Sequence, residues 1–270
     1  MHDSLDDMAS SLDLAAYLAR IGHAGSGAPD AALLRTLHRA HATRIPFENL
    51  DLMLGRPISV ELADIEAKLV GARRGGYCFE QNLLFGAALR ALGFAPRPLL
   101  ARVRVDGLRV LPRTHMVLAL EVDGARVVAD VGFGAGGLLE PVPLDPPGEV
   151  AIGHWAWRVV REGELHVMQS ARAGVWRDLY AFSLEPQLPV DIAVANHYVS
   201  THPDSRFLQT LTAQRLTPQA RYTLRNRELT VDRGDALETR TLASREEVLR
   251  VQGDDFGLAL PADAPLRLPG

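Results

Sequence analysis

Hydrophobic positions in the first ninety residues recur every three or four residues, which is the spacing of amphipathic helices. The stretches with this pattern are residues 12–21, 31–42, 62–72 and 77–92. Pro29 and Asp30 precede the second stretch and favour a helix start there, and Gly93 follows the fourth as a stop signal. The pattern therefore predicts a helical lobe over residues 1–93.

Beyond residue 93 the hydrophobic residues gather in short strand-like runs. Residues 113–122 and 125–131 flank Asp123 and Gly124, which form the signature of a two-residue hairpin turn. A second hairpin is expected over residues 155–170 and a further strand over residues 176–180. Short strands joined by tight turns predict a barrel or a sandwich.

The remaining segments are less regular. Residues 141–148 contain four prolines and are expected to form a surface loop without regular structure. After Pro189 the pattern is mixed, with a helix expected over residues 191–200 and short strands over residues 209–231. Ser244 and Glu247 form a capping-box signature, which predicts a final short helix that ends before Gly253.

Composition and charge narrow the class of protein. The formal net charge of −4 argues against a general nucleic-acid binder, and no apolar run approaches the length of a membrane helix. The acidic residues 1–7 are unlike a secretory signal. A single cysteine, with no second cysteine to form a disulfide, is typical of a cytoplasmic protein.

That cysteine, Cys78, is the first candidate for chemistry. It follows Gly75 and Gly76 and begins the fourth helical stretch, where the free N–H groups of the first turn favour a thiolate. A lone cysteine is often a small core residue, and this alternative stays open on the position alone. A zinc site is disfavoured because no cysteine or histidine companion lies nearby in the sequence.

A nucleophilic thiol needs a base, and usually a third group that orients the base. In the predicted hairpin residue 122 pairs with residue 125, which makes His115 and Asp130 diagonal neighbours on one face. A three-residue turn would instead place the two side chains on opposite faces. Both interrupt otherwise apolar strands, so we expect them to be buried against each other.

Two further patterns are candidates for binding sites. Residues 132–137 match the glycine pattern of a dinucleotide-binding loop, but the prolines that follow oppose the helix that such a site requires. The glycines expose backbone N–H groups near Asp130 that are suited to phosphates, and a flexible strand end without a ligand is the alternative that stays open. His38 and His41 lack further metal ligands, and we expect them to be partly exposed residues of a helix.

Several motifs together resemble those of the arylamine N-acetyltransferases over nearly the whole chain. They include RRGGYCFEQN at residues 73–82 and further motifs at residues 17–22, 45–51, 113–115, 129–134 and 179–187. The resemblance implies acetyl transfer from acetyl-CoA to an aromatic amine or hydrazine through an acetyl-cysteine. By motif position it implies a triad of Cys78, His115 and Asp130, which are the residues selected above.

The resemblance also implies binding roles and no metal. Phe47 and Phe133 would contact the acceptor, and Thr114, Gly134 and Phe207 would contact coenzyme A. Arg20, Glu48 and Arg74 would form an ion network beside the site.

The implied fold is α+β with a papain- or transglutaminase-like Cys-His-Asp core. Residues 1–93 would form a helical bundle, residues 94–188 a β-barrel, and residues 189–270 a mixed α/β lobe. A homo-oligomer is possible, and no nucleic-acid or membrane partner is expected. Two alternatives remain: a thiol hydrolase or transglutaminase-like enzyme, since the same triad serves amide chemistry, and a non-catalytic binder that keeps the fold.

Overall fold

The computed structural model describes residues 12–23, 27–104 and 110–268, so the acidic residues 1–7 lie outside the described residues. The first part of the chain is helical, as predicted. Its elements are α1 (Leu14–Ile21), α2 (Ala31–Arg44), α3 (Leu50–Met53), α4 (Leu62–Glu66), η2 (Ala67–Gly71) and α5 (Cys78–Ala91). The stretch predicted over residues 62–72 is a short α-helix that continues as the π-helix η2.

Local chemistry explains where these helices begin and end. Asp13 and Asp30 are the N-caps of α1 and α2, and their side chains accept hydrogen bonds from the N–H groups of Ala16 and Leu33. Gly22 ends α1 in the left-handed conformation, with φ of 64°. Twelve of the fourteen residues of α5 are buried, so this helix runs through the interior of the molecule.

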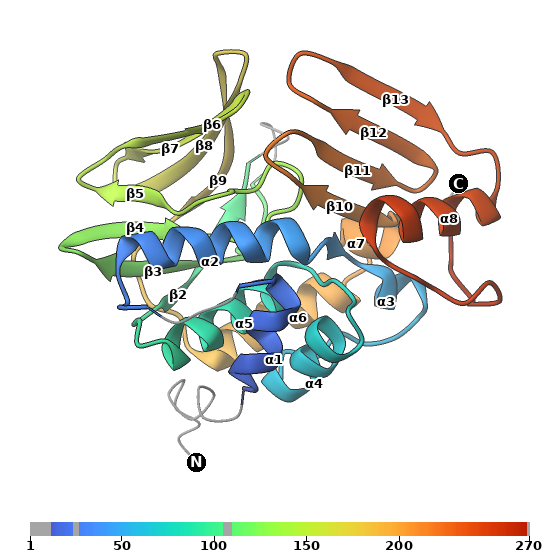
Figure 1. The fold of residues 1–270 in the computed structure, drawn as a ribbon, viewed down its shortest axis with the longest axis horizontal. Coiled ribbons are helices and arrows are strands. Elements are labelled where there is room, and N and C mark those ends of the chain that lie inside the picture. The colour runs from blue at the N-terminus through green and yellow to red at the C-terminus, as the bar shows by residue number, and fades with distance from the viewer. Residues whose placement is uncertain (1–11, 24–26, 105–109, 269–270) are drawn as a thin grey trace.

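Eight antiparallel strands form the central sheet (Figure 1). They are β2 (Arg97–Val103), β3 (His115–Val122), β4 (Ala125–Ala129), β5 (Val142–Asp145), β6 (Glu149–Ile152), β7 (Trp155–Glu162), β8 (Leu165–Arg172) and β9 (Val175–Phe182). Their order is β5-β4-β3-β2-β9-β8-β7-β6, and β5 also contacts β6 and β7. The sheet therefore curls into a nearly closed barrel, which confirms the barrel alternative.

The prediction of a structureless loop over residues 141–148 was wrong. Val142 to Asp145 form β5, which pairs with β4, and Val142 and Leu144 are buried in the barrel. Strand β5 is at one end of the strand order, next to β4 only. Proline has no N–H group to donate to a neighbouring strand, and an edge strand of this kind tolerates it. The buried alternate positions outweigh the low strand propensity of proline.

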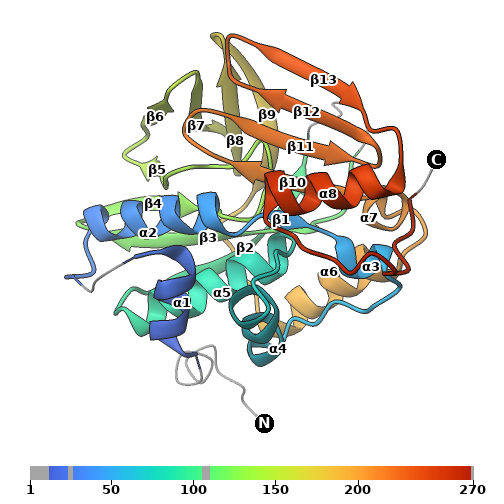
Figure 2. The ribbon, with the colours of Figure 1, turned by 45° about the vertical axis from the view of Figure 1, so that its right-hand side comes forward.

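A five-stranded sheet joins one strand of the helical segment to four strands of the C-terminal segment. It contains β1 (Phe47–Glu48), β10 (Thr212–Leu216), β11 (Arg221–Arg225), β12 (Glu228–Asp232) and β13 (Leu237–Thr241). Strand β1 pairs with β10, with Phe47 opposite Gln214. Residues of the helical segment and of the C-terminal segment thus share one sheet (Figure 2).

The C-terminal helices are α6 (Pro189–Thr201), α7 (Arg206–Gln209) and α8 (Arg245–Phe256). Helix α6 packs into the N-terminal helical core, where Asn196 bonds to the Tyr77 hydroxyl and to the Ile58 carbonyl. The prediction that the last helix ends before Gly253 was wrong. Helix α8 continues to Phe256, and Gly257, with φ of 68°, is its C-cap residue. The division of the chain at residues 93 and 188 stays a prediction.

Two hydrophobic clusters hold these parts together. The larger one joins the N-terminal helices, α5, part of β3 and the C-terminal lobe, and the smaller one fills the barrel around Trp155, Trp157 and Tyr180. Among the described residues no helix is long and apolar enough to span a bilayer. The nucleophile candidate belongs to the larger cluster, so the site is built on the main core.

Burial in this cluster gives a stability prediction. Leu37 on α2 is fully buried, whereas Leu237 on β13 is 59% exposed. We expect Leu37→Ala to lower the free energy of unfolding by about 3 kcal/mol, because it removes buried methyl groups and leaves a cavity. The matched Leu237→Ala change should cost less than about 0.5 kcal/mol. Urea unfolding of the full chain measures both, and equal losses would contradict this assignment of the core.

Candidate active site

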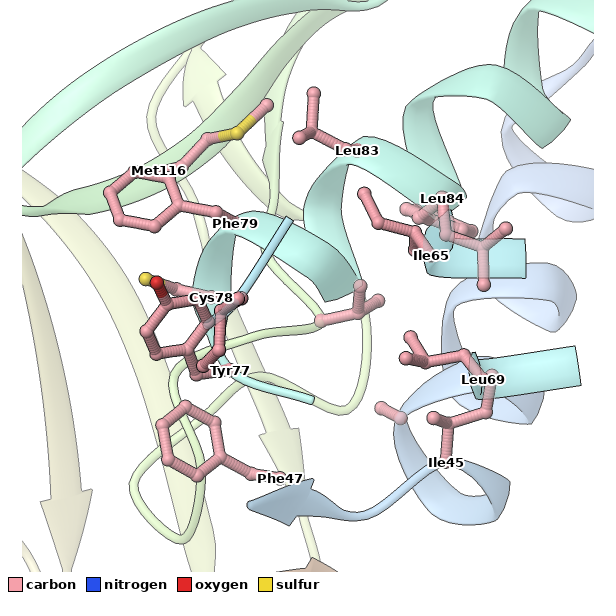
Figure 3. Packing of buried hydrophobic residues seen from close by; sticks show 14 of the residues in the cluster. Ile45, Phe47, Ile65, Leu69, Tyr77, Cys78, Phe79, Leu83, Leu84 and Met116 are labelled. Carbon is pink, nitrogen blue, oxygen red and sulfur yellow. The ribbon is translucent and has the colours of Figure 1, made fainter. Parts of the chain in front are cut away.

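Cys78 is the first residue of α5 and belongs to the larger hydrophobic cluster. Figure 3 shows it at the first turn of the helix, with Phe47, Tyr77 and Phe79 around it. Its side chain is buried, with 3% of its surface exposed, and Sγ lies 3.7 Å from the Thr114 carbonyl oxygen. The helix start is fixed by Glu80, whose Oε2 accepts the Tyr77 N–H at 3.0 Å.

The two glycines before Cys78 allow close packing of the chain on itself. A Cβ atom on Gly75 would lie 2.2 Å from the Pro46 carbonyl oxygen, so only glycine fits there. The Glu48 N–H donates to the Gly76 carbonyl at 3.1 Å. The turn therefore packs closely against residues 46–48, which fixes the backbone that leads to the thiol.

A buried ion network lies behind this turn. Its members are Glu48, Asp51, Lys68, Arg74 and Glu80. Arg74 bonds to Glu48 at 2.8 Å, and the Lys68 ammonium lies 2.6 Å from Asp51 and 2.7 Å from Glu80. Burial raises the pKa of Glu80 to about 7, against the lowering effect of Lys68. The network ties β1, α3 and η2 to the helix that carries Cys78.

Arg20 has a different role from the one expected. It was predicted to join the ion network, but its guanidinium donates to main-chain carbonyls, at 2.9 Å to Leu69 and 2.8 Å to Arg44. Burial lowers its pKa to about 10, and the neighbouring cations Arg73 and Arg44 add to this effect. Arg20 therefore holds the ends of α2 and η2 together.

His115 and Asp130 form a buried pair across the predicted hairpin. Val122 pairs with Ala125 and Leu118 with Ala129, which is the register expected from a two-residue turn. His115 Nε2 lies 2.7 Å from Asp130 Oδ2. The other ring nitrogen, Nδ1, is left to bond with the thiol. A hydrogen bond with Cys78 is one of the interactions that raise the pKa of His115. The structure thus brings the three sequence candidates together.

The pair is strongly coupled. Burial alone would lower the pKa of His115, but the Asp130 carboxylate, its hydrogen bond and Cys78 together raise it from 6.5 to about 10. Burial would raise the pKa of Asp130, but the His115 imidazolium and further hydrogen bonds hold it below its usual value. His115 is therefore cationic and Asp130 anionic near neutral pH.

Asn82 holds the Asp130 carboxylate in place and was missed as a functional residue in the sequence. Its Nδ2 donates to Asp130 Oδ1 at 3.0 Å and to the Met116 carbonyl at 2.8 Å, and its Oδ1 accepts the Val131 N–H. The Gly132 N–H also donates to Asp130 Oδ1, at 2.9 Å. The available signal was its position one helical turn after Cys78, on the same face.

The expectation that His38 and His41 are partly exposed was wrong. Both are fully buried, because α2 packs both rings against Phe85 of α5. His41 bonds to the Tyr17 hydroxyl at 2.9 Å and to Gln81 at 2.7 Å. Burial lowers the pKa of His38 to about 4 and of His41 to about 3, so both rings are neutral near pH 7. Polar partners, not solvent, bind both ring nitrogens of His41 and the Nε2 atom of His38.

Aromatic side chains border the triad. Phe47, Phe133 and Gly134 line a small cavity together with Asp130 and Gln214. The Phe133 ring lies 5.1 Å from the His115 ring, measured between ring centroids. The ring of Tyr180, on β9, lies 4.8 Å from the His115 ring. Tyr180 was not singled out in the sequence, because a tyrosine in a strand is usual in a barrel core.

The remaining sequence candidates lie around the same place. The Phe207 ring of α7 is 5.9 Å from the rings of both Phe47 and Tyr77. Thr114 precedes His115 and presents its carbonyl oxygen to the thiol. Within residues 12–23, 27–104 and 110–268, no group of three or more histidine, cysteine or acidic side chains is arranged to hold a metal ion.

Comparisons with known proteins agree along most of the chain. A family model described as N-acetyltransferase matches residues 30–264. The arylamine N-acetyltransferase of Mycolicibacterium smegmatis is 41% identical over 256 residues, with 93% of each chain covered. The crystal structure of the Nocardia farcinica arylamine N-acetyltransferase matches with a TM-score of 0.89 at 40% identity, covering 95% of this chain and 93% of that one. The Mycobacterium marinum arylamine N-acetyltransferase in complex with CoA matches with a TM-score of 0.86 at 35% identity, covering 91% and 93%.

The coupling of His115 and Asp130 predicts a pH-dependent contribution to stability. Because the folded-state pKa of His115 is raised, the pair stabilises fully below about pH 6.5, and the contribution is lost as the pH rises toward about 10. Asp130→Asn should therefore lower the free energy of unfolding more at about pH 6 than at about pH 9.5. Asp178→Asn, which removes a carboxylate from the barrel surface, should show no such trend. A constant effect of Asp130→Asn over this range would contradict the ion pair.

Proposed function

The chain belongs to the arylamine N-acetyltransferase family, and we propose that Cys78, His115 and Asp130 transfer acetyl groups from acetyl-CoA to aromatic amines or hydrazines. The observation that carries the proposal is the single cysteine at the start of α5 beside the buried His115–Asp130 pair. A thiol, a base and an orienting carboxylate in this order are the parts that acyl transfer through a covalent intermediate requires.

In the first half-reaction His115 already holds the proton of Cys78 as an imidazolium, and the Cys78 thiolate attacks the acetyl carbonyl of acetyl-CoA. A new carbon–sulfur bond forms to Cys78, and the bond to coenzyme A breaks. The imidazolium of His115 gives its proton to the leaving thiolate. We propose that main-chain N–H groups in the first turn of α5 stabilise the oxyanion that forms in between.

In the second half-reaction the amine nitrogen attacks the acetyl-Cys78 thioester. His115, now neutral, accepts a proton from the nitrogen as the carbon–nitrogen bond forms, and the Cys78 thiolate leaves beside the resulting imidazolium. Asp130 stays ionised in both halves and holds the ring with Nε2 toward itself. The two substrates therefore react in turn, in a ping-pong mechanism.

The binding contacts are assigned by position. Phe47 and Phe133 border the cavity next to Asp130, which supports their role as the wall that stacks on an aromatic acceptor. Thr114, Gly134 and Phe207 surround the same region, and we keep them as coenzyme A contacts. The cytoplasmic location and a homo-oligomeric state stay predictions from the sequence.

Of the two alternatives, a thiol hydrolase would use the same three residues with water in place of the amine. The family assignment favours the transferase, since the relatives above are named for acetyl transfer to arylamines. A non-catalytic binder is disfavoured by the coupled His115–Asp130 pair, which a binding site has no need to keep beside a free thiol.

The first test is the intact mass of the protein after incubation with acetyl-CoA in the absence of an amine. We expect the wild type to gain one acetyl group and to lose it when an arylamine is added, because Cys78 is the only thiol of the chain. Cys78→Ala should gain none and show no turnover.

Asp130→Asn should keep the thiol but lose about 10³- to 10⁴-fold in kcat, as expected when the orienting carboxylate of a triad is removed. An acetyl adduct on Cys78→Ala, or no adduct and no acetylated amine with the wild type, would overturn the proposal. In the second case, turnover of peptide or glutamine substrates would identify the hydrolase alternative.

A second prediction concerns Phe47. Its ring, on β1, lines the cavity beside Asp130 and carries no polar group, so Phe47→Leu removes a stacking surface and leaves the hydrogen bond between His115 and Asp130 in place. We expect the KM for an arylamine to rise by about tenfold, with a smaller effect on the rate at which acetyl-CoA acetylates Cys78. Steady-state kinetics and rapid-quench mass spectrometry separate the two effects. Equal losses in both half-reactions would place Phe47 outside the acceptor contacts.

A further inference from the structure

The main chain of Asp130 has a partner that the mechanism does not use. Its N–H donates to Nε2 of His38 over 3.1 Å, and both residues are fully buried. His38 lies on α2, in the helical part of the molecule, whereas Asp130 directly follows β4 of the barrel. This hydrogen bond therefore joins helix α2 to the main chain of Asp130, the residue that carries the triad carboxylate.

This bond requires one state of His38. An imidazole nitrogen accepts a hydrogen bond only when it carries no proton, so the ring is neutral and its proton is on Nδ1. The pKa of His38 is about 4, chiefly because the ring is buried, which keeps it neutral through the working pH range. The ring stands edge-on to Phe85, with centroids 5.6 Å apart, so its orientation is set by packing.

We propose that His38 is a positioning residue of the triad, which holds the Asp130 backbone so that the carboxylate stays against His115. The proposal rests on the function assigned above. The carboxylate is fixed at Oδ1 by Asn82 and Gly132 and at Oδ2 by His115. These contacts hold the far end of the side chain, whereas His38 holds the near end.

The consequence of losing this bond follows from burial. Without His38 the Asp130 N–H would be a buried donor with no acceptor, which strongly favours a shift of the chain toward another partner or water. A shift of the backbone moves the carboxylate away from His115. The groups that face the His115 ring are Asp130, Cys78, Phe133 and Tyr180, and Asp130 raises its pKa more than Cys78 does. A displaced carboxylate therefore lowers the pKa of His115.

The test compares variants that keep or remove the acceptor in the full-length chain. His38→Gln places an amide oxygen at about the position of Nε2, His38→Phe keeps the ring without an acceptor, and His38→Asn has an acceptor that is too short to reach. His41→Phe is the matched control, because His41 is equally buried on the same helix and also packs on Phe85 but does not bond to Asp130.

The readout is the titration of His115, followed by NMR with ¹³C-labelled histidine and assigned with His115→Gln. We expect the midpoint to fall by about one unit or more in His38→Phe and His38→Asn, and kcat to fall about tenfold with little change in KM. His38→Gln should retain most of the wild-type midpoint and kcat. His41→Phe should lower thermal stability but leave the His115 midpoint unchanged.

Each outcome decides the proposal. If His38→Phe or His38→Asn, folded as judged by circular dichroism, keeps the wild-type midpoint and kcat, His38 has no positioning role, although the acetyl-Cys78 mechanism stands. If His41→Phe shifts the midpoint as far as His38→Phe, the effect belongs to core packing and the proposal fails. Absence of an acetyl adduct in the wild type would refute the function itself, and the mass experiment detects this independently.

Discussion

The contact on which the site depends is the 2.7 Å pairing of His115 and Asp130 in a place closed to water. Both groups pay a desolvation penalty, and neither would stay charged there alone. Each makes the charged form of the other the stable one, so a cation is held beside the only thiol of the chain. The surrounding structure keeps this pair in register, through the hairpin on one side and Asn82 on the other.

Three parts of the molecule meet at this pair. The barrel provides His115 and Asp130, α5 provides Cys78 and Asn82, and α2 reaches the Asp130 backbone through His38. The C-terminal segment adds Gln214, which stands opposite Phe47 in the shared sheet and accepts a hydrogen bond from the Ala135 N–H at 2.7 Å. The site is therefore a property of the packed whole, because each part holds a different atom of it.

The sequence predicted much of this where local rules decide the outcome. The Asp123-Gly124 turn fixes the hairpin register, and that register alone placed His115 beside Asp130. The helical periodicity that begins at Tyr77 placed Cys78 in a first turn. Only the resemblance to a known family indicated Phe47, because β1 is two residues long and its partner β10 lies far along the chain.

Predictions failed where tertiary contacts override local preference. Residues 142–145 form a strand because Val142 and Leu144 fill the barrel, although Pro143 opposes a strand. His38 and His41 are polar residues on a helix, and the spacing of the sequence does not show that Asp130, Tyr17 and Gln81 provide their hydrogen bonds. Asn82 was visible on the correct face of α5, but its partners come from the barrel.

The burial of Lys68 bears on how an acetylating enzyme avoids modifying itself. Lys68 is the only lysine in the sequence, and its ammonium is bound between Asp51 and Glu80. Burial would lower its pKa, but the neighbouring carboxylates hold it above its usual value, so the unprotonated amine that attacks a thioester is scarce. The arginines that replace lysine elsewhere are not nucleophilic at neutral pH. The side chains of this protein therefore offer the acetyl group on Cys78 no free lysine amine to react with, and the group is kept for an amine that arrives from solution.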